Sequence, residues 1–558
     1  MLSLGQYRYT PLGAGRQIRL LRLKPGEESA EIRISIFDVN LDHQPDYEAL
    51  SYTWGDPGNT IRIICNEDGD SLLVTQNCQA ALRRLRFKTE ERTLWIDAVC
   101  IDQNNISERG QQVQLMSEIY RQAKRVLAYL GEASDDSDIG MDFVLQDADM
   151  IGRTSRPPVG LGPNTTSSPQ QRAIDHILER SYFKRVWILQ EIVFAKEIQI
   201  VLGNRTVNWT DFSRTVFYVD INKKMYLRTK YGQRPPSAVF YRDRSTSFSS
   251  GKTSSEMPQS LLELLRDTRH CQSTNPRDKI HALLGMSTEK NELALAPDYS
   301  LTTQQTFIHL TKFLINRDKR LDVLSHIQGC SSIQDLPSWV PDWSFPCATE
   351  VLGHKKDSVR PYKASLERPT NVLFQHDLET LVVEGKVFDT ISKVGPVFKM
   401  GSDSSAITLQ HWENIVSALK SDRDIDASAS FMDTLIAYPS YAGPNAFGRF
   451  YPSWRCITIG EEDIGEREKA EATIFQDQVN KASSGRALFV TEKGYMGLGP
   501  AELQIGGKVV VLLGGSVPYV LWDKQRYFNF VGECYVRGLM NGEAIQDNTV
   551  NFQAIHIR

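Results

Sequence analysis

The chain has 558 residues, of which 41% are hydrophobic and 24% are charged, and its formal net charge is -4. This is the balance of an ordinary globular protein with enough apolar residues for a sizeable core, and the length indicates about three or four domains. The small negative charge gives no reason to expect nucleic acid or an anionic membrane as a partner.

The eight cysteines are scattered, with no CxxC pair and no Cys/His cluster at the spacing of metal ligands. The sequence therefore predicts neither a metal site nor a disulfide framework, and reduced thiols are typical of a cytosolic protein. Met1–Thr10 lacks a basic segment followed by a long apolar one, and apolar runs such as Val509–Leu513 are too short to cross a bilayer. We expect a cytoplasmic protein without a membrane span.

Residues 17–23 and 31–37 alternate apolar with polar side chains, which is typical of half-buried strands. They predict a β lead-in hairpin within residues 1–46. Cys100 falls in the apolar stretch 93–101, so we interpret it as an inert core residue rather than a nucleophile.

From Tyr47 onwards, apolar strand-like stretches alternate with helical patterns. The predicted strands are 49–54, 93–101, 125–130 and 198–202, and the predicted helices are 77–86 (capped by Asn77), 110–125 and 180–195. This alternation predicts an α/β domain over residues 47–204, a parallel sheet with right-handed crossovers and helices on both faces. Ligands of such sheets bind beyond the carboxyl ends of the strands.

The remainder of the chain contains two further regions with different predicted secondary structure. Residues 205–345 are predicted to form a helical accessory region, which includes helices at 260–267 and at 278–285, the second ending at a glycine. Residues 346–558 are rich in strand patterns separated by Gly-rich turns, which predicts a β-rich C-terminal region folded as a small barrel or a folded-over sheet.

Glu191 lies inside an apolar run. The sixteen residues Arg180–Ala195 contain neither Gly nor Pro and predict one helix, in which no Lys or Arg stands one turn from Glu191. Its carboxylate should be partly desolvated, with a raised pKa, unless a distant residue satisfies it. Two interpretations stay open here, a structural carboxylate bonded to backbone amides or a remote arginine, and a functional one.

The motifs together resemble a known family. Four segments are similar to the fungal heterokaryon-incompatibility (HET) domain: Tyr47–Asp56, Leu94–Gln103, Glu108–Val113 and Arg185–Glu191. Three more are similar to accessory segments of the same proteins: Asn275–Gly285, Leu336–Trp343 and Gly532–Glu543. The resemblance implies a role in non-self recognition and programmed cell death. It also implies a domain distantly similar to Toll/interleukin-receptor (TIR) domains, and hence a flavodoxin-like sheet.

Enzymatic TIR domains cleave NAD at the nicotinamide–ribose bond with a glutamate, and the resemblance places Glu191 at that catalytic position. Candidate nucleotide-binding residues are Trp54, Gly55, Asp56, Asp97, Asp102, Arg109 and Trp187. Core packing of the two tryptophans, loop capping by Asp97 and Asp102, and a solvated charge at Arg109 remain alternatives. A carboxylate in a dry pocket can stabilise the oxocarbenium-like charge that builds on the ribose.

Three hypotheses follow. In the first, the protein is a NAD glycohydrolase that has NAD as its substrate and needs no cofactor. In the second, it is a non-catalytic scaffold that assembles with itself or with a partner signalling protein. In the third, residues 205–558 hold the TIR-like domain silent, so that truncation at Asn204 would raise its activity or toxicity.

Overall fold

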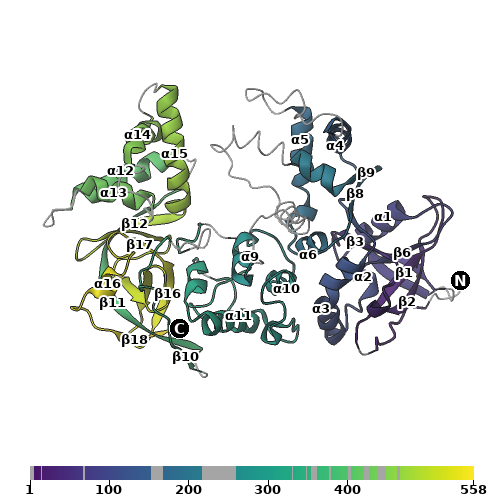
Figure 1. The fold of residues 1–558 in the computed structure, drawn as a ribbon, viewed down its shortest axis with the longest axis horizontal. Coiled ribbons are helices and arrows are strands. Elements are labelled where there is room, and N and C mark those ends of the chain that lie inside the picture. Colours follow the sequence, from purple (N-terminus) through teal and green to yellow (C-terminus); the bar gives the residue numbers. More distant parts are fainter. Residues whose placement is uncertain are drawn as a thin grey trace. The chain divides into compact units, whose positions relative to one another are not determined.

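The computed structural model describes residues 5–13, 15–66, 70–151, 168–216, 259–329, 331–346, 349–353, 361–375, 379–399, 404–419, 427–437, 448–460 and 465–558. The chain divides into two compact units, Met1–Leu301 and Thr302–Arg558, whose elements are labelled in Figure 1. The domain boundaries predicted at 46/47, 204/205 and 345/346 stay predictions.

The first unit is built on a mixed sheet in the order β5-β4-β2-β1-β6-β3-β7-β8-β9. Its strands are β1 (Gln17–Leu23), β2 (Arg33–Asn40), β3 (Glu48–Tyr52), β4 (Thr60–Cys65), β5 (Asp70–Thr75), β6 (Arg92–Trp95), β7 (Val126–Tyr129), β8 (Ile198–Leu202) and β9 (Arg205–Asn208). The central strands β6, β3, β7 and β8 pair in parallel. The predicted parallel sheet is therefore present, flanked by antiparallel pairs on both sides.

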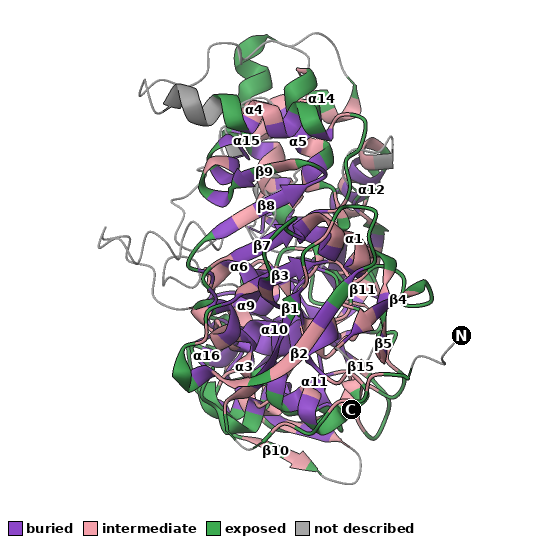
Figure 2. Ribbon diagram, turned by 90° about the vertical axis from the view of Figure 1, so that its right-hand side faces the viewer, coloured by how far each residue is buried: buried purple, intermediate pink, exposed green. Residues whose placement is uncertain are grey.

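The predicted lead-in hairpin is confirmed, because β1 and β2 pair antiparallel along their whole length. It joins the same sheet, since β1 also pairs with β6. Figure 2 shows β3, β7 and β8 buried along most of their length, whereas β4 nearer the sheet edge is largely exposed or intermediate. Strands covered on both faces need the near-continuous apolar sequences that β3 and β7 have.

Helices lie between these strands or follow the last of them. They are α1 (Gln76–Leu85), α2 (Asp97–Cys100), α3 (Ile106–Gln122), α4 (Ser137–Ile151), α5 (Pro169–Leu178), η2 (Ser181–Lys184, 3-10), α6 (Ile188–Val193), α9 (Leu261–Asp267) and α10 (Asp278–Leu284). Short 3-10 turns also occur at η1 (Leu41–His43) and η3 (Leu293–Leu295).

The single helix predicted over Arg180–Ala195 is wrong. The segment forms the 3-10 turn η2 and the short helix α6, with the backbone of Arg185 extended between them (φ -77°, ψ 139°). Arg185 forms an isolated β-bridge with Gln272. A backbone pairing with a distant segment therefore overrides the local helical preference.

Other predicted boundaries differ as well: the helix predicted over 110–125 begins at Ile106, and the strand predicted over 49–54 ends at Tyr52. The strand predicted over 93–101 ends at Trp95, and Asp97 begins the helical turn α2. There the Asp97 side chain accepts a hydrogen bond from the Ala98 N–H at 2.7 Å. The cap of α1 is Thr75, whose hydroxyl accepts from the Cys78 N–H. Asn77, predicted as the cap, instead donates to the backbone carbonyl and hydroxyl of Thr53.

The second unit contains a closed β-structure. Its strands are β10 (Val372–Gln375), β11 (Thr380–Val397), β12 (Arg486–Thr491), β13 (Met496–Pro500), β14 (Lys508–Leu512), β15 (Tyr519–Asp523), β16 (Phe528–Glu533), β17 (Tyr535–Val536) and β18 (Gln553–Ile557). Pairing of β14 with β11 closes β11, β14, β15, β16 and β18 into a ring. The predicted β-rich region is thus barrel-like.

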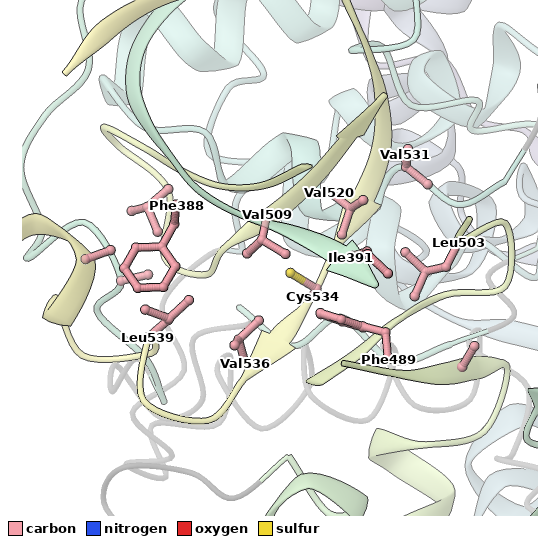
Figure 3. Close-up of a cluster of buried hydrophobic side chains, with 14 of the residues drawn as sticks. Phe388, Ile391, Phe489, Leu503, Val509, Val520, Val531, Cys534, Val536 and Leu539 are labelled. Atoms are coloured by element: carbon pink, nitrogen blue, oxygen red, sulfur yellow. The ribbon is translucent and has the colours of Figure 1, made fainter. Parts of the chain in front are cut away.

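The barrel core is apolar. Phe388, Phe489, Val509 and Cys534 lie in one buried cluster (Figure 3). The helices of this unit are α11 (Thr303–Asp318), η4 (Asp322–His326), α12 (Ser404–Ser417), α13 (Ala427–Leu435), η5 (Gly448–Phe450), α14 (Tyr451–Ile459), α15 (Glu466–Ala482) and α16 (Glu543–Gln546). None of the helices in the described ranges is both long enough and apolar enough for a bilayer span.

Candidate functional site

Glu191 is buried near the carboxyl end of β3, the strand that carries its partner Ser51. Its side chain is 2% exposed, and its carboxylate accepts a hydrogen bond from the Ser51 hydroxyl in β3. Ser51 is one residue from the carboxyl end of that strand. The sequence motif thus brings its glutamate to the strand ends, inside the packed protein.

A chain of hydroxyl groups leads to this carboxylate. The Ser51 Oγ also lies 2.7 Å from the Tyr182 hydroxyl of η2. A serine hydroxyl has one proton, and Ser51 gives it to Glu191, so Tyr182 donates to Ser51. Both hydroxyl-bearing side chains are buried, so the chain is shielded from water and its hydrogen bonds are strong.

The pKa of Glu191 is raised to about 7, chiefly by burial. The Arg185 charge and the Ser51 hydrogen bond oppose the rise, and the Asp97 charge adds to it. The raised pKa predicted from the sequence is confirmed in direction. The Arg185 guanidinium donates to the backbone carbonyl of Tyr52 and acts on Glu191 as a nearby charge. A carboxyl group that titrates near neutral pH suits either a structural or a catalytic role.

Trp54 and Asp97 come together at the ends of two neighbouring strands. The Trp54 indole N–H donates to Asp97 Oδ2 at 2.8 Å. The pKa of Asp97 is raised mainly by burial, while Arg185 and the Trp54 hydrogen bond act in the opposite direction. The Arg185 guanidinium lowers the pKa of both Asp97 and Glu191, and the charge of Asp97 raises the pKa of Glu191. These residues, with Ser51, form the cluster that we call the strand-end cluster (Ser51, Trp54, Asp97, Arg185 and Glu191).

Three predicted residues lie in turns beside this cluster. Gly55 has a φ of +80°, where a side chain would be strained. Asp56 is exposed and caps its own turn by accepting from the Gly58 N–H at 2.9 Å. Asp102 accepts from the Asn104 N–H at 3.1 Å in the loop before α3. The contacts of both aspartates are those of loop-capping residues.

Arg109 and Trp187 contribute to a second cluster in the same unit. The Trp187 indole N–H donates to Asp278 Oδ2 at 3.0 Å, and the Tyr299 hydroxyl donates to Asp278 Oδ1 at 2.8 Å. The Arg109 guanidinium carbon lies 4.4 Å from the centre of the Tyr299 ring, a cation–π contact. These two predicted residues therefore make these contacts with Asp278 and Tyr299.

The motif around Glu108 has a structural explanation. Its carboxylate is paired with Arg19 of β1 through both oxygens, at 2.5 and 3.1 Å, and accepts from the Asp102 N–H at 2.8 Å. Arg19 is fully buried and also donates to the Cys100 carbonyl at 3.1 Å. The pair ties the lead-in hairpin to the loop after β6. Cys100 is itself buried, with a pKa raised to about 12, as an inert core thiol.

Sequence analysis missed Ser51 and Arg185 as neighbours of Glu191. Ser51 stands in an apolar strand pattern, where a single hydroxyl carries no distinct signal. Arg185 lies within the motif that drew attention to Glu191, but a continuous helix would have placed it on a different turn. In the folded unit the backbone is extended at Arg185, and its charge acts on both Glu191 and Asp97.

Comparison with known proteins locates two matching segments. Residues 47–191 match the model of the family described as heterokaryon incompatibility protein (HET), and residues 465–552 match that of the Het-6 beta-barrel domain. The first match begins just before β3 and ends at Glu191, and the second covers most of the barrel strands. The predicted resemblance is confirmed for these two segments.

Two relatives extend the comparison. The chain is 24% identical to heterokaryon incompatibility protein 6, OR allele, of Neurospora crassa, over 94% of each chain. It is 26% identical to vegetative incompatibility protein HET-E-1 of Podospora anserina over 122 residues, which are 21% of this chain and 9% of that protein. No solved structure matches the chain.

Proposed function

We propose that this protein is an effector of heterokaryon incompatibility, which responds to non-self fusion by cell death. The observation that carries the proposal is the similarity to heterokaryon incompatibility protein 6 over 94% of both chains, together with matches to a HET domain and to its accompanying barrel. Similarity along the whole chain supports a shared role for the two units, beyond one shared domain.

We further propose that the HET domain is TIR-like and hydrolyses NAD at the nicotinamide–ribose bond. In the parallel core, the strands lie in the order second, first, third, fourth, counted along the chain. Flavodoxin-like sheets have this order and bind nucleotides at the switch between the first and third strands. Ser51, which holds Glu191, is the last residue but one of the first of these strands.

The strand-end cluster supplies the chemistry. Glu191 in its ionised form stabilises the positive charge that develops on the ribose as nicotinamide leaves, and a pKa of about 7 keeps a large fraction ionised at neutral pH. Asp97 accepts from a ribose hydroxyl, and Trp54 stacks on a ring. Since Glu191 is 2% exposed, catalysis requires a rearrangement at the strand ends, which self-association would supply.

The test is nicotinamide release from NAD by the purified full-length protein, dilute and concentrated. Glu191→Gln should reduce turnover at least a hundredfold. The control Glu197→Gln, at an exposed carboxylate immediately before the first residue of β8, should keep wild-type turnover. Absence of turnover in every assembled state of the wild-type protein would reject the hydrolase.

Two observations favour a second function. Glu191 is buried and its carboxylate accepts a hydrogen bond from Ser51, and a purely structural carboxylate has the same features. In this alternative the HET domain is a non-catalytic scaffold that assembles with itself or with a signalling partner. Expression of Glu191→Gln in a fungal host separates the two functions. Retained cell death with a folded variant supports the scaffold, and lost cell death supports the enzyme.

A further inference from the structure

The entry to helix α6 is fixed by a segment beyond the HET-matched residues. The Val186 N–H donates to the Gln272 carbonyl at 2.9 Å, and the Gln272 N–H donates to the Lys184 carbonyl at 2.5 Å. These two bonds hold the backbone extended at Arg185, immediately before α6. They therefore set the position at which the helix begins.

A side-chain bond from the same segment fixes the rotation of α6. Trp187 precedes Glu191 by one helical turn and donates to Asp278, the first residue of α10. Tyr299 occupies the other oxygen of Asp278. Because both oxygens of Asp278 accept hydrogen bonds, the carboxyl group is a fixed anchor for the indole.

The third contact lies beside Glu191 itself. Gly285, at the end of α10, packs against the buried side chain of Gln190 so closely that an added Cβ would overlap with its amide nitrogen. The Glu191 carboxylate itself is held by Ser51 of β3. Its helix is thus fixed between the sheet and α10.

We propose that residues 272–285 are a positioning clamp for Glu191, with Asp278 as the positioning residue that acts through Trp187. The functional unit then extends beyond the HET-matched residues 47–191 and includes α10. The clamp is built into the same compact unit as the sheet. The effect of the clamp on kcat rests on the proposed NAD hydrolysis, whereas its effect on amide exchange around Glu191 does not.

The experiment compares full-length variants at Asp278. Asp278→Leu removes the acceptor, whereas Asp278→Asn keeps one amide oxygen that can accept from Trp187. The control Asp298→Leu alters an exposed turn outside the clamp residues 272–285, in which Asp298 accepts from the Ser300 N–H at 2.8 Å. Hydrogen–deuterium exchange of peptides covering residues 185–195 is measured in each variant, with kcat, KM and the pH profile of NAD hydrolysis.

Asp278→Leu should speed amide exchange across residues 185–195 about tenfold, because the helix opens locally. It should lower kcat about a hundredfold with little change in KM, since Glu191 is misplaced, and shift the acidic limb of the pH profile. Asp278→Asn should restore part of the protection and of kcat. Asp298→Leu should match the wild type.

Unchanged exchange in Asp278→Leu overturns the clamp, whatever NAD hydrolysis does. Faster exchange in a protein whose wild type lacks NAD turnover rejects the hydrolase and leaves the clamp in place. If Asp278→Leu exchanges its amides faster throughout residues 1–301, the first unit has been destabilised as a whole. The milder variant Trp187→Phe then tests the clamp. Exchange that is faster only within 185–195 supports the clamp, and wild-type exchange overturns it.

Discussion

At the residue scale, Glu191 makes stability depend on pH. Its pKa is about 7 in the folded protein and 4.5 in a model peptide. Between these values the folded state binds a proton that the unfolded state has lost, so the free energy of unfolding falls as pH rises through this window. The loss is on the order of 3 kcal/mol.

Glu191→Gln should remove this dependence, because the amide carries no charge and has the shape of the neutral acid. The variant should be more stable than the wild type at pH 8 and similar to it at pH 5, as measured by chemical denaturation at both values. Glu91→Gln is the control, since Glu91 is exposed and pairs with Lys24. A variant destabilised equally at both pH values would show that Glu191 does not titrate in this window.

At the scale of elements, the buried Arg19–Glu108 pair connects the lead-in hairpin to the loop after β6. Arg19→Met should destabilise the first unit by about 3–5 kcal/mol, because Glu108, 6% exposed, would be left as an uncompensated charge. The measurement is the denaturant dependence of tryptophan fluorescence.

The matched control is Arg16→Met, which removes partly exposed pairs with Asp42 and Glu118 and should cost less than about 1 kcal/mol. The double variant Arg19→Met with Glu108→Leu should recover much of the loss, since no charge then remains buried. Equal effects of Arg16→Met and Arg19→Met would contradict the importance of the buried pair.

Prediction from sequence succeeded where the signal was local. The strands β3, β7 and β8 are short apolar stretches bounded by turns, and their pattern alone indicates burial on both faces. It failed at Arg185, where the extended backbone depends on Gln272, far along the chain. The same dependence explains why Ser51 and Arg185 were missed, because their proximity to Glu191 exists only in the folded unit.

At the scale of the whole molecule, one hypothesis is that truncation at Asn204 raises activity or toxicity. The structure leads us to expect instead that the truncated protein is unstable. Cutting there removes α9 and α10, which belong to the same compact unit as the sheet. Apolar side chains such as Phe183, 5% exposed in the intact chain, would lose part of their cover. We expect residues 1–204 to aggregate, and residues 1–301 to keep their circular dichroism.

Solubility and circular dichroism of the two fragments test this expectation. A soluble, folded fragment 1–204 with raised toxicity would instead support an inhibitory role of residues 205–558. Aggregation of both fragments would show that the first unit depends on the second.

The long strand β11 has a consequence for the second unit. Its first half pairs with β18, β14 and β10, and its second half pairs with β12. The ring and the layer formed by β12, β13 and β17 therefore share one continuous backbone. Neither can come apart without fraying the other, so the C-terminal half should melt in a single step rather than piece by piece.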